Sequence, residues 1–133
     1  MMKATIRVRM SAKDAHYGGE LVNGSRQLDL FGDVGTELMI KHDGDEGLLK
    51  LYKEVEFFAP VYVGDFIEAE GEIVKVGNTS RIIEFKSWKV AESLRDPNEP
   101  SAAQVVEPRV LVCKATGVTV VPKERQRIDH SNK

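Results

Sequence analysis

The chain has 133 residues, of which 19 are basic and 21 acidic, so its formal net charge is −2. This length allows one hydrophobic core of ordinary size and is too short for two independent domains. The charges are mixed along the chain, which excludes a long basic arm of the kind that grips nucleic acid. We therefore expect a single domain over residues 1–133 with no nucleic-acid partner.

The apolar segments indicate neither an export signal nor a membrane span. The N-terminal segment MMKATIRVRM spaces its charges through the only early apolar stretch, and no later stretch reaches the roughly 20 apolar residues that cross a bilayer. We expect a cytoplasmic protein with no membrane partner. The single cysteine, Cys113, excludes an internal disulfide, and its place in an apolar alternation favours a small buried side chain.

The predicted elements begin with one strand and one helix. Residues 4–10 alternate apolar and polar side chains, which is typical of a half-buried strand. A glycine-rich turn then leads into a helix from about residue 25 to residue 42. We expect this helix to pack closely against a sheet, because Gly32 and Gly35 fall on its apolar face. The apolar side chains of that face are Leu28, Phe31, Leu38 and Met39.

The rest of the chain predicts four more strands. YKEVEFFAPVYVGDFIEAEGEIVKV divides into two strands at a turn around Pro60 and Gly64, and Gly77 marks the next turn. TSRIIEFKSWKVAES and RVLVCKATGVTVV supply the last two strands, and the proline-containing RDPNEPSAAQVVEP between them predicts a connection. The polar tail, residues 124–133, is expected to be frayed or solvated. The order is typical of an α+β domain, with a curved antiparallel sheet wrapped around one central helix.

The predicted helix carries acids opposite its apolar face. Asp33 and Glu37 lie four residues apart and share a face, and Asp29 extends the line one turn back. Such acids repel each other by about 0.2–0.5 kcal/mol per pair, so solvent or a positively charged or proton-sharing ligand must compensate. A solvated face and a catalytic acid pair both remain open.

The turn before the helix combines proton-transfer side chains with backbone donors. His16 and Tyr17 stand directly before a glycine pair, and backbone N–H groups there can point at an enolate-like or thioester oxygen. Packing of the loop is the alternative role for this pair of rings. The candidate substrate-binding residues of this turn are Gly18, Gly19, Asn23 and Gly24.

Two further candidates lie in predicted strands. Glu56 shares a strand face with Glu54, so it is either a third acid of the site or a solvent-exposed carboxylate. Arg81 suits a phosphate contact on a ligand, as it suits many protein surfaces. The three histidines lack a metal-ligand spacing, so we expect no metal. The glycine pair lacks the spacing of three glycines that binds a dinucleotide.

Several motifs together resemble one enzyme family. The segments DAHY, LVNG, GDVGTEL, DGD, APVYVGDF and KVGN resemble the coenzyme A dependent ammonia lyases of the hot-dog superfamily, and the likeness covers nearly the whole chain. These are the 3-aminobutyryl-CoA and β-alanyl-CoA ammonia lyases of amino-acid fermentation. LDLFGDV, DEGL and PSAAQVV are closer to the 3-aminobutyryl type, whereas FxxPVxxGD and VGxTS also occur in hot-dog thioesterases.

The resemblance implies a hot-dog fold, homodimers or larger homo-oligomers, and acyl-CoA held between subunits. It implies reversible elimination of ammonia from 3-aminobutyryl-CoA to give crotonyl-CoA in lysine fermentation, with no cofactor because coenzyme A is part of the substrate. Glu37 or Asp33 would remove the α-proton while the other holds the ammonium. The alternatives are a β-alanyl-CoA ammonia lyase, a hot-dog thioesterase and a non-catalytic acyl-CoA binding module.

Overall fold

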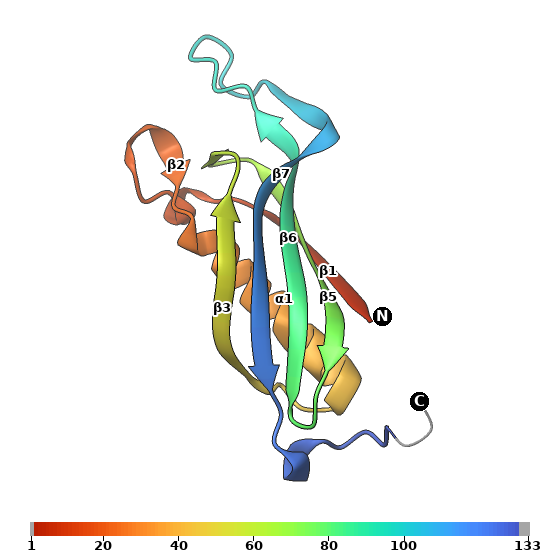
Figure 1. The fold of residues 1–133 in the computed structure, drawn as a ribbon. Helices are drawn as coiled ribbons and strands as arrows, with labels where there is room; N and C mark the ends of the chain where they lie inside the picture. The colour runs from red at the N-terminus through yellow and green to blue at the C-terminus, as the bar shows by residue number, and fades with distance from the viewer. Residues whose placement is uncertain (1, 131–133) are drawn as a thin grey trace.

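The computed structural model describes residues 2–130 and shows an α+β domain. One antiparallel sheet of five strands curves around a single long helix, α1 (Ser25–Asp43), as Figure 1 shows. A small two-stranded sheet lies beside the beginning of that helix. The order across the large sheet is β1 (Lys3–Arg9), β5 (Phe66–Val76), β6 (Ser80–Ser93), β7 (Ala103–Val120) and β3 (Leu48–Phe57); β2 (Leu21–Val22) pairs with β4 (Val61–Tyr62). The predicted fold class is confirmed.

The apolar face of α1 is buried against the sheet. The ring of Phe31 stacks on that of Phe85 from β6, with 5.1 Å between ring centroids. A Cβ atom on Gly35 would lie 3.4 Å from the same Phe85 ring, so the missing side chain permits the close packing that was predicted. Leu28 is only partly buried, and the helix contributes two apolar side chains that its predicted stripe left out. These are Leu30 and Val34.

The connection before β7 is shorter than predicted, because the strand already begins at Ala103. Pro108, which we expected in the connection, therefore lies inside β7. Lys89 of β6 faces Val110 while Ala91 faces Val105, so residues 106–109 bulge out of the ladder. A proline has no N–H to donate, and a bulge is a place in a strand where none is needed.

The C-terminal tail is held against the end of α1 as far as His130. The backbone N–H of Arg127 donates to the carbonyl oxygen of Asp43 at 2.8 Å, and Gln126 Nε2 donates to the Val121 carbonyl at 2.9 Å. Hydrogen bonds therefore hold the described part of the tail in place while Glu124, Arg125 and Arg127 are exposed to solvent, and residues 131–133 lie outside the described chain. No helix within residues 2–130 is both long and apolar enough to cross a membrane.

Candidate functional site

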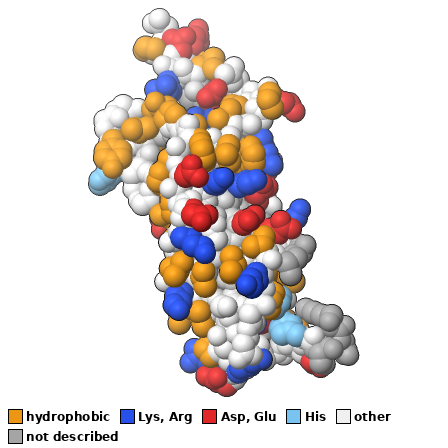
Figure 2. Space-filling model, in the orientation of Figure 1, with side chains coloured by type: hydrophobic (Ala, Val, Ile, Leu, Met, Phe, Trp, Pro, Cys, Tyr) orange, Lys and Arg blue, Asp and Glu red, His pale blue; other side chains and the backbone are white. Residues whose placement is uncertain are grey.

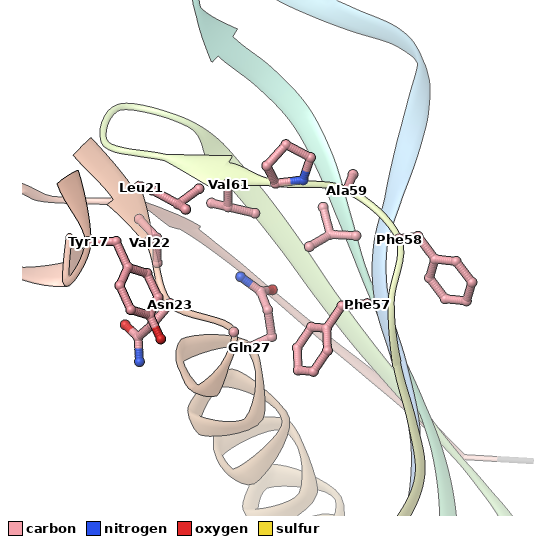
Figure 3. A pocket seen from close by; sticks show the side chains of 12 residues that line it. Tyr17, Leu21, Val22, Asn23, Gln27, Phe57, Phe58, Ala59 and Val61 are labelled. Atoms are coloured by element: carbon pink, nitrogen blue, oxygen red, sulfur yellow. The ribbon is translucent and has the colours of Figure 1, made fainter. Parts of the chain in front are cut away.

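A pocket of about 500 Å³ opens at the N-terminal end of α1, between the turn before the helix and the segment that follows β3 (Figure 3). Its wall is mostly apolar, which suits an acyl chain better than a charged group. Tyr17, Asn23 and Gly24 of the predicted site line it, together with other residues that we did not predict. Among these are Gln27, Phe57 and Val61.

The turn beside this pocket is open and carries exposed rings. The His16 and Tyr17 rings meet edge to face with centroids 5.1 Å apart, and Tyr17 lines the pocket while 56% of it is exposed. Gly19 has a φ of +70°, and a Cβ on either Gly18 or Gly19 would meet nothing within 4 Å. Neither glycine nor His16 is among the residues that line the pocket. The turn therefore leaves space for a ligand beside it.

The beginning of α1 packs directly against Phe57 from the end of β3. A Cβ on Gly24 would lie 2.7 Å from the Phe57 ring, so only glycine permits this contact. Asn23 Nδ2 donates to the Ser25 hydroxyl, and the Asn23 carbonyl accepts the backbone N–H of Arg26 at 3.2 Å. Asn23 thus shapes the start of the helix, and its predicted role in substrate binding stays a prediction.

The acids of α1 lie outside this pocket, on the helix face that borders β3. Asp33 is exposed, and Glu37 pairs with Lys41 at 3.2 Å. Burial raises the pKa of Tyr52 on β3 to about 12, and the nearby Asp29 and Asp33 carboxylates add to the effect. The Tyr52 hydroxyl donates to the Leu28 carbonyl of α1 at 2.8 Å, so this part of α1, with Asp29 and Asp33, lies next to the sheet edge formed by β3. Within the described chain, Asp33 and Glu37 share a face as predicted but are not buried together.

Glu56 is exposed beside an irregularity of β3. The pairing with β7 shifts register between Lys53 and Glu56, and Glu54 has a φ of +56°. This bulge lets Tyr52 and Val55 both pack against the core although they are three residues apart. Glu54 and Glu56 are both exposed, so of the two roles that we left open the structure favours the solvated carboxylate.

Arg81 is not free to bind a ligand, which corrects its predicted role. It is 1% exposed, and its Nε and Nη2 donate to the buried Asp43 carboxylate at 3.0 and 2.8 Å. Its Nη1 donates to the carbonyls of Gly77 and Ser80, each at 3.0 Å. Burial would raise the pKa of Asp43, but hydrogen bonds from Arg81, His42 and His130 hold it well below its usual range. Arg81 therefore joins the end of α1 to β6.

Two histidines complete the surroundings of Asp43. His130 Nε2 lies 3.0 Å from Asp43 Oδ1, and His42 Nδ1 lies 3.0 Å from Oδ2. One nitrogen or oxygen atom from each of the three residues could bind a metal, and these atoms lie within 4.8 Å of one another. The spacing in the sequence did not indicate this cluster, because Asp43 and His130 are 87 residues apart. The rings stack at 4.3 Å with only 25° between their planes. Lone pairs of such nearly parallel rings do not converge on one ion, so this geometry suits a hydrogen bond between His130 and Asp43, with His42 in ion-pair distance of the same carboxylate.

Gln27 is the polar residue of the pocket that sequence reasoning missed. It is 1% exposed, and neither its Nε2 nor its Oε1 has a hydrogen-bond partner among residues 2–130. One signal was present: Gln27 precedes the predicted core residue Phe31 by four residues and so lies on the same helix face. A polar side chain at a core position of a helix therefore indicates a candidate site residue.

Comparisons with known proteins agree with the fold and refine it. Residues 19–92 match the family model of the thioesterase superfamily. The chain is 56% identical to the 3-aminobutyryl-CoA ammonia lyase of Acetoanaerobium sticklandii over 126 residues, which cover 95% of this chain and 99% of that protein.

Two solved structures are also similar. The β-alanyl-CoA:ammonia lyase from Clostridium propionicum has a TM-score of 0.92 and 48% identity, with 98% of this chain and 92% of that chain covered. A hexameric hot-dog-fold thioesterase of Campylobacter jejuni has a TM-score of 0.73 at 19% identity, with 96% and 89% covered, and so shares the fold. The chain therefore belongs to the hot-dog thioesterase superfamily and, within it, to the family of coenzyme A dependent ammonia lyases.

Proposed function

We propose that this protein is a 3-aminobutyryl-CoA ammonia lyase, which reversibly eliminates ammonia to give crotonyl-CoA and serves lysine fermentation. The observation that carries this proposal is the 56% identity to a lyase of that name over 95% of the chain. The apolar pocket at the start of α1 supports it, because it is large enough for a short acyl chain. The acids of α1 supply groups for proton transfer.

The reaction needs a base for the α-proton and a partner for the amino group. The thioester carbonyl acidifies the α-proton, which Asp33 or Glu37 takes, while the other carboxylate holds the β-ammonium. The electrons of the α C–H bond form the double bond, and those of the C–N bond leave with ammonia. No oxidant or reductant enters this balance, so we propose that the enzyme works without a cofactor beyond the coenzyme A of its substrate.

We propose that each active site forms between two copies of the chain. The Asp33 and Glu37 face of α1 is not covered by the described part of the same chain. Next to it, β3 forms an edge of the sheet and exposes Leu48 (68%) and Leu51 (41%). Figure 2 shows apolar side chains interspersed with both signs of charge over the face of the molecule that is seen in Figure 1.

A β-alanyl-CoA ammonia lyase is the second candidate, since the enzyme of that name from Clostridium propionicum gives a TM-score of 0.92. The two substrates differ by one methyl group on the β-carbon. A single methylene in an apolar pocket separates substrates only 10- to 200-fold, by about 1–3 kcal/mol, so both reactions deserve measurement. Hydrolysis of the thioester, the activity named for the superfamily, is the third reaction to test.

The test is to incubate the protein with ammonium and either crotonyl-CoA or acrylyl-CoA, and to follow enoyl-thioester absorbance together with free thiol. We expect absorbance to fall without thiol release, and faster with crotonyl-CoA. Glu37→Gln and Asp33→Asn should each lower the rate by roughly 10²–10⁴-fold. Glu84→Gln, the same change at an exposed acid of β6, should not.

Each other outcome of this test identifies one of the alternatives. Faster reaction of acrylyl-CoA would assign the β-alanyl activity. Prompt thiol release would identify a thioesterase, and no change in either signal would refute the lyase.

A further inference from the structure

The carboxamide of Gln27 is a buried polar group that lacks a partner inside the described chain. Gln27 lies in the first turn of α1, and Figure 3 shows its side chain extending from the helix into the pocket. The side chain is 1% exposed, yet neither Oε1 nor Nε2 accepts or donates a hydrogen bond among residues 2–130. Leaving such an amide unpaired lowers stability, so buried amides are normally hydrogen-bonded. A ligand that enters the pocket is a partner that would satisfy it.

The immediate surroundings of this amide are mostly apolar. Val22 and Val61 are buried beside it at 6% and 4% exposure, and the aromatic ring of Phe57 lies on its other side (Figure 3). A mostly apolar wall with a few polar groups gives a ligand orientation as well as affinity, and among these groups only Gln27 is both buried and without a hydrogen bond in the described chain. Such a wall suits a short apolar group that carries an acceptor and a donor close together.

We propose, on the basis of the proposed function, that Gln27 makes a two-point contact with a β-aminoacyl thioester. Nε2–H donates to the thioester carbonyl oxygen, and Oε1 accepts from the ammonium on the β-carbon. The carbonyl carbon and the β-carbon are separated by the α-carbon, so the carbonyl oxygen and the ammonium come side by side when the acyl chain of the substrate folds back. A plain acyl thioester has only the first of them, so Gln27 selects the β-amino compound.

The same contact assists the chemistry. Negative charge grows on the carbonyl oxygen as the α-proton leaves, so the hydrogen bond from Nε2 becomes stronger in the transition state than in the bound substrate. Oε1 meanwhile holds the amino group until the C–N bond breaks. Gln27 is thus a catalytic residue that touches both reacting ends of the acyl group.

Access to Gln27 requires one side chain to move. Both amide atoms are covered, and the Phe57 ring packs so closely on the start of α1 that a Cβ on Gly24 would lie 2.7 Å from it. Phe57 is nevertheless 54% exposed and lies outside the buried core, so its ring has room to turn toward solvent. Rotation of this ring would uncover the amide to the entering acyl chain.

The test compares Gln27→Met with Gln104→Met, which makes the same change at an exposed glutamine of β7. Three quantities are measured for each variant: the Tm without ligand, the Kd values of butyryl-CoA and of free coenzyme A by calorimetry, and the KM of ammonium in the addition to crotonyl-CoA. Butyryl-CoA carries the carbonyl group but no amine, and coenzyme A carries neither.

We expect Gln27→Met to keep or raise the Tm, because it removes an unpaired buried amide. The variant should raise the Kd of butyryl-CoA roughly tenfold, while the Kd of coenzyme A stays unchanged. It should raise the KM of ammonium by a similar factor. Gln104→Met should leave all three quantities near wild type.

A lower Tm for Gln27→Met, with unchanged Kd and KM values, would overturn the proposal and make Gln27 a structural residue. A wild-type protein without lyase activity would refute the proposed function and, with it, the ammonium contact. The carbonyl contact would then still be decided by butyryl-CoA: a loss of affinity in Gln27→Met confirms it, and an unchanged Kd refutes it.

Discussion

The ion pair between Arg81 and Asp43 predicts a large loss of stability when one partner is removed. Arg81→Met leaves the Asp43 carboxylate, which is 0% exposed, without its guanidinium and with only the two histidines beside it. Breaking a buried pair in this way costs about 3–5 kcal/mol, because one charge stays buried without compensation. A loss of that size is a large share of the roughly 5–15 kcal/mol that stabilises an ordinary domain.

The assay is urea unfolding followed by circular dichroism at one fixed protein concentration, since the stability of an oligomer depends on concentration. Arg7→Met is the matched control: its ion pair with Glu68 is as short, at 2.7 Å, but the Arg7 side chain is 61% exposed. That change should cost only about 0–1 kcal/mol. The double variant Arg81→Met/Asp43→Leu removes both buried charges and should recover much of the loss.

One pair of results would refute this reasoning. If Arg81→Met lowered the free energy of unfolding by less than about 1 kcal/mol, as a surface change does, and raised the KM for acyl-CoA, then Arg81 would contact the coenzyme after all. The sequence-based role would then be right, and the buried position of the guanidinium wrong.

Three more predictions follow from burial. The pKa of Asp43 is lower in the folded state than its ordinary 3.8, so the carboxylate stabilises the fold above pH 3.8 and this stabilisation is lost as the pH falls below that value. The decrease in Tm on acidification should therefore be smaller for Asp43→Asn than for wild type. Burial raises the pKa of Cys113 to about 11, so iodoacetamide at pH 8 should modify it only after unfolding, as mass spectrometry would show. Gly71→Ala should cost about 1–3 kcal/mol in urea unfolding, because its Cβ would lie 2.8 Å from the buried Val34, whereas Gly32→Ala should cost nothing.

The main elements could be predicted because their patterns are periodic and local. The helical spacing of Phe31, Leu38 and Met39 and the alternation of the strands each report a face that is buried over many residues. The buried position of Cys113 followed from the same alternation and is confirmed at 0% exposure. Together with the motifs, these patterns were sufficient for the fold and the family.

The irregular and long-range features were not predictable in the same way. A bulge such as the one at Glu54 interrupts the alternation for a single residue and resembles ordinary sequence variation. The pairing of Arg81 with Asp43 joins residues 38 apart, and nothing local distinguishes this arginine from a surface one. The pocket also remained hidden, because the start of α1 and the end of β3 meet only in the folded chain.

The position of Gln27 relative to the acids leads to the last prediction. Along α1, Asp33 lies roughly 9 Å and Glu37 roughly 15 Å beyond Gln27, and at 3.6 residues per turn both point to other sides of the helix. A four-carbon acyl group that contacts Gln27 is too short to reach these acids on its own helix. The acids must then come from the second copy of the chain.

Mixing two variants of lowered activity tests this arrangement, with ammonium and acyl-CoA kept below their KM values. When Gln27→Met and Glu37→Gln subunits are unfolded, combined and refolded, each mixed dimer should hold one site with both native residues, so about a quarter of the wild-type activity should return. If both residues serve the same site from one chain, no mixed dimer contains an intact site and the activity stays at the level of the single variants. Lack of recovery, in a mixture shown by native mass spectrometry to contain mixed dimers, would therefore exclude a site shared in this way.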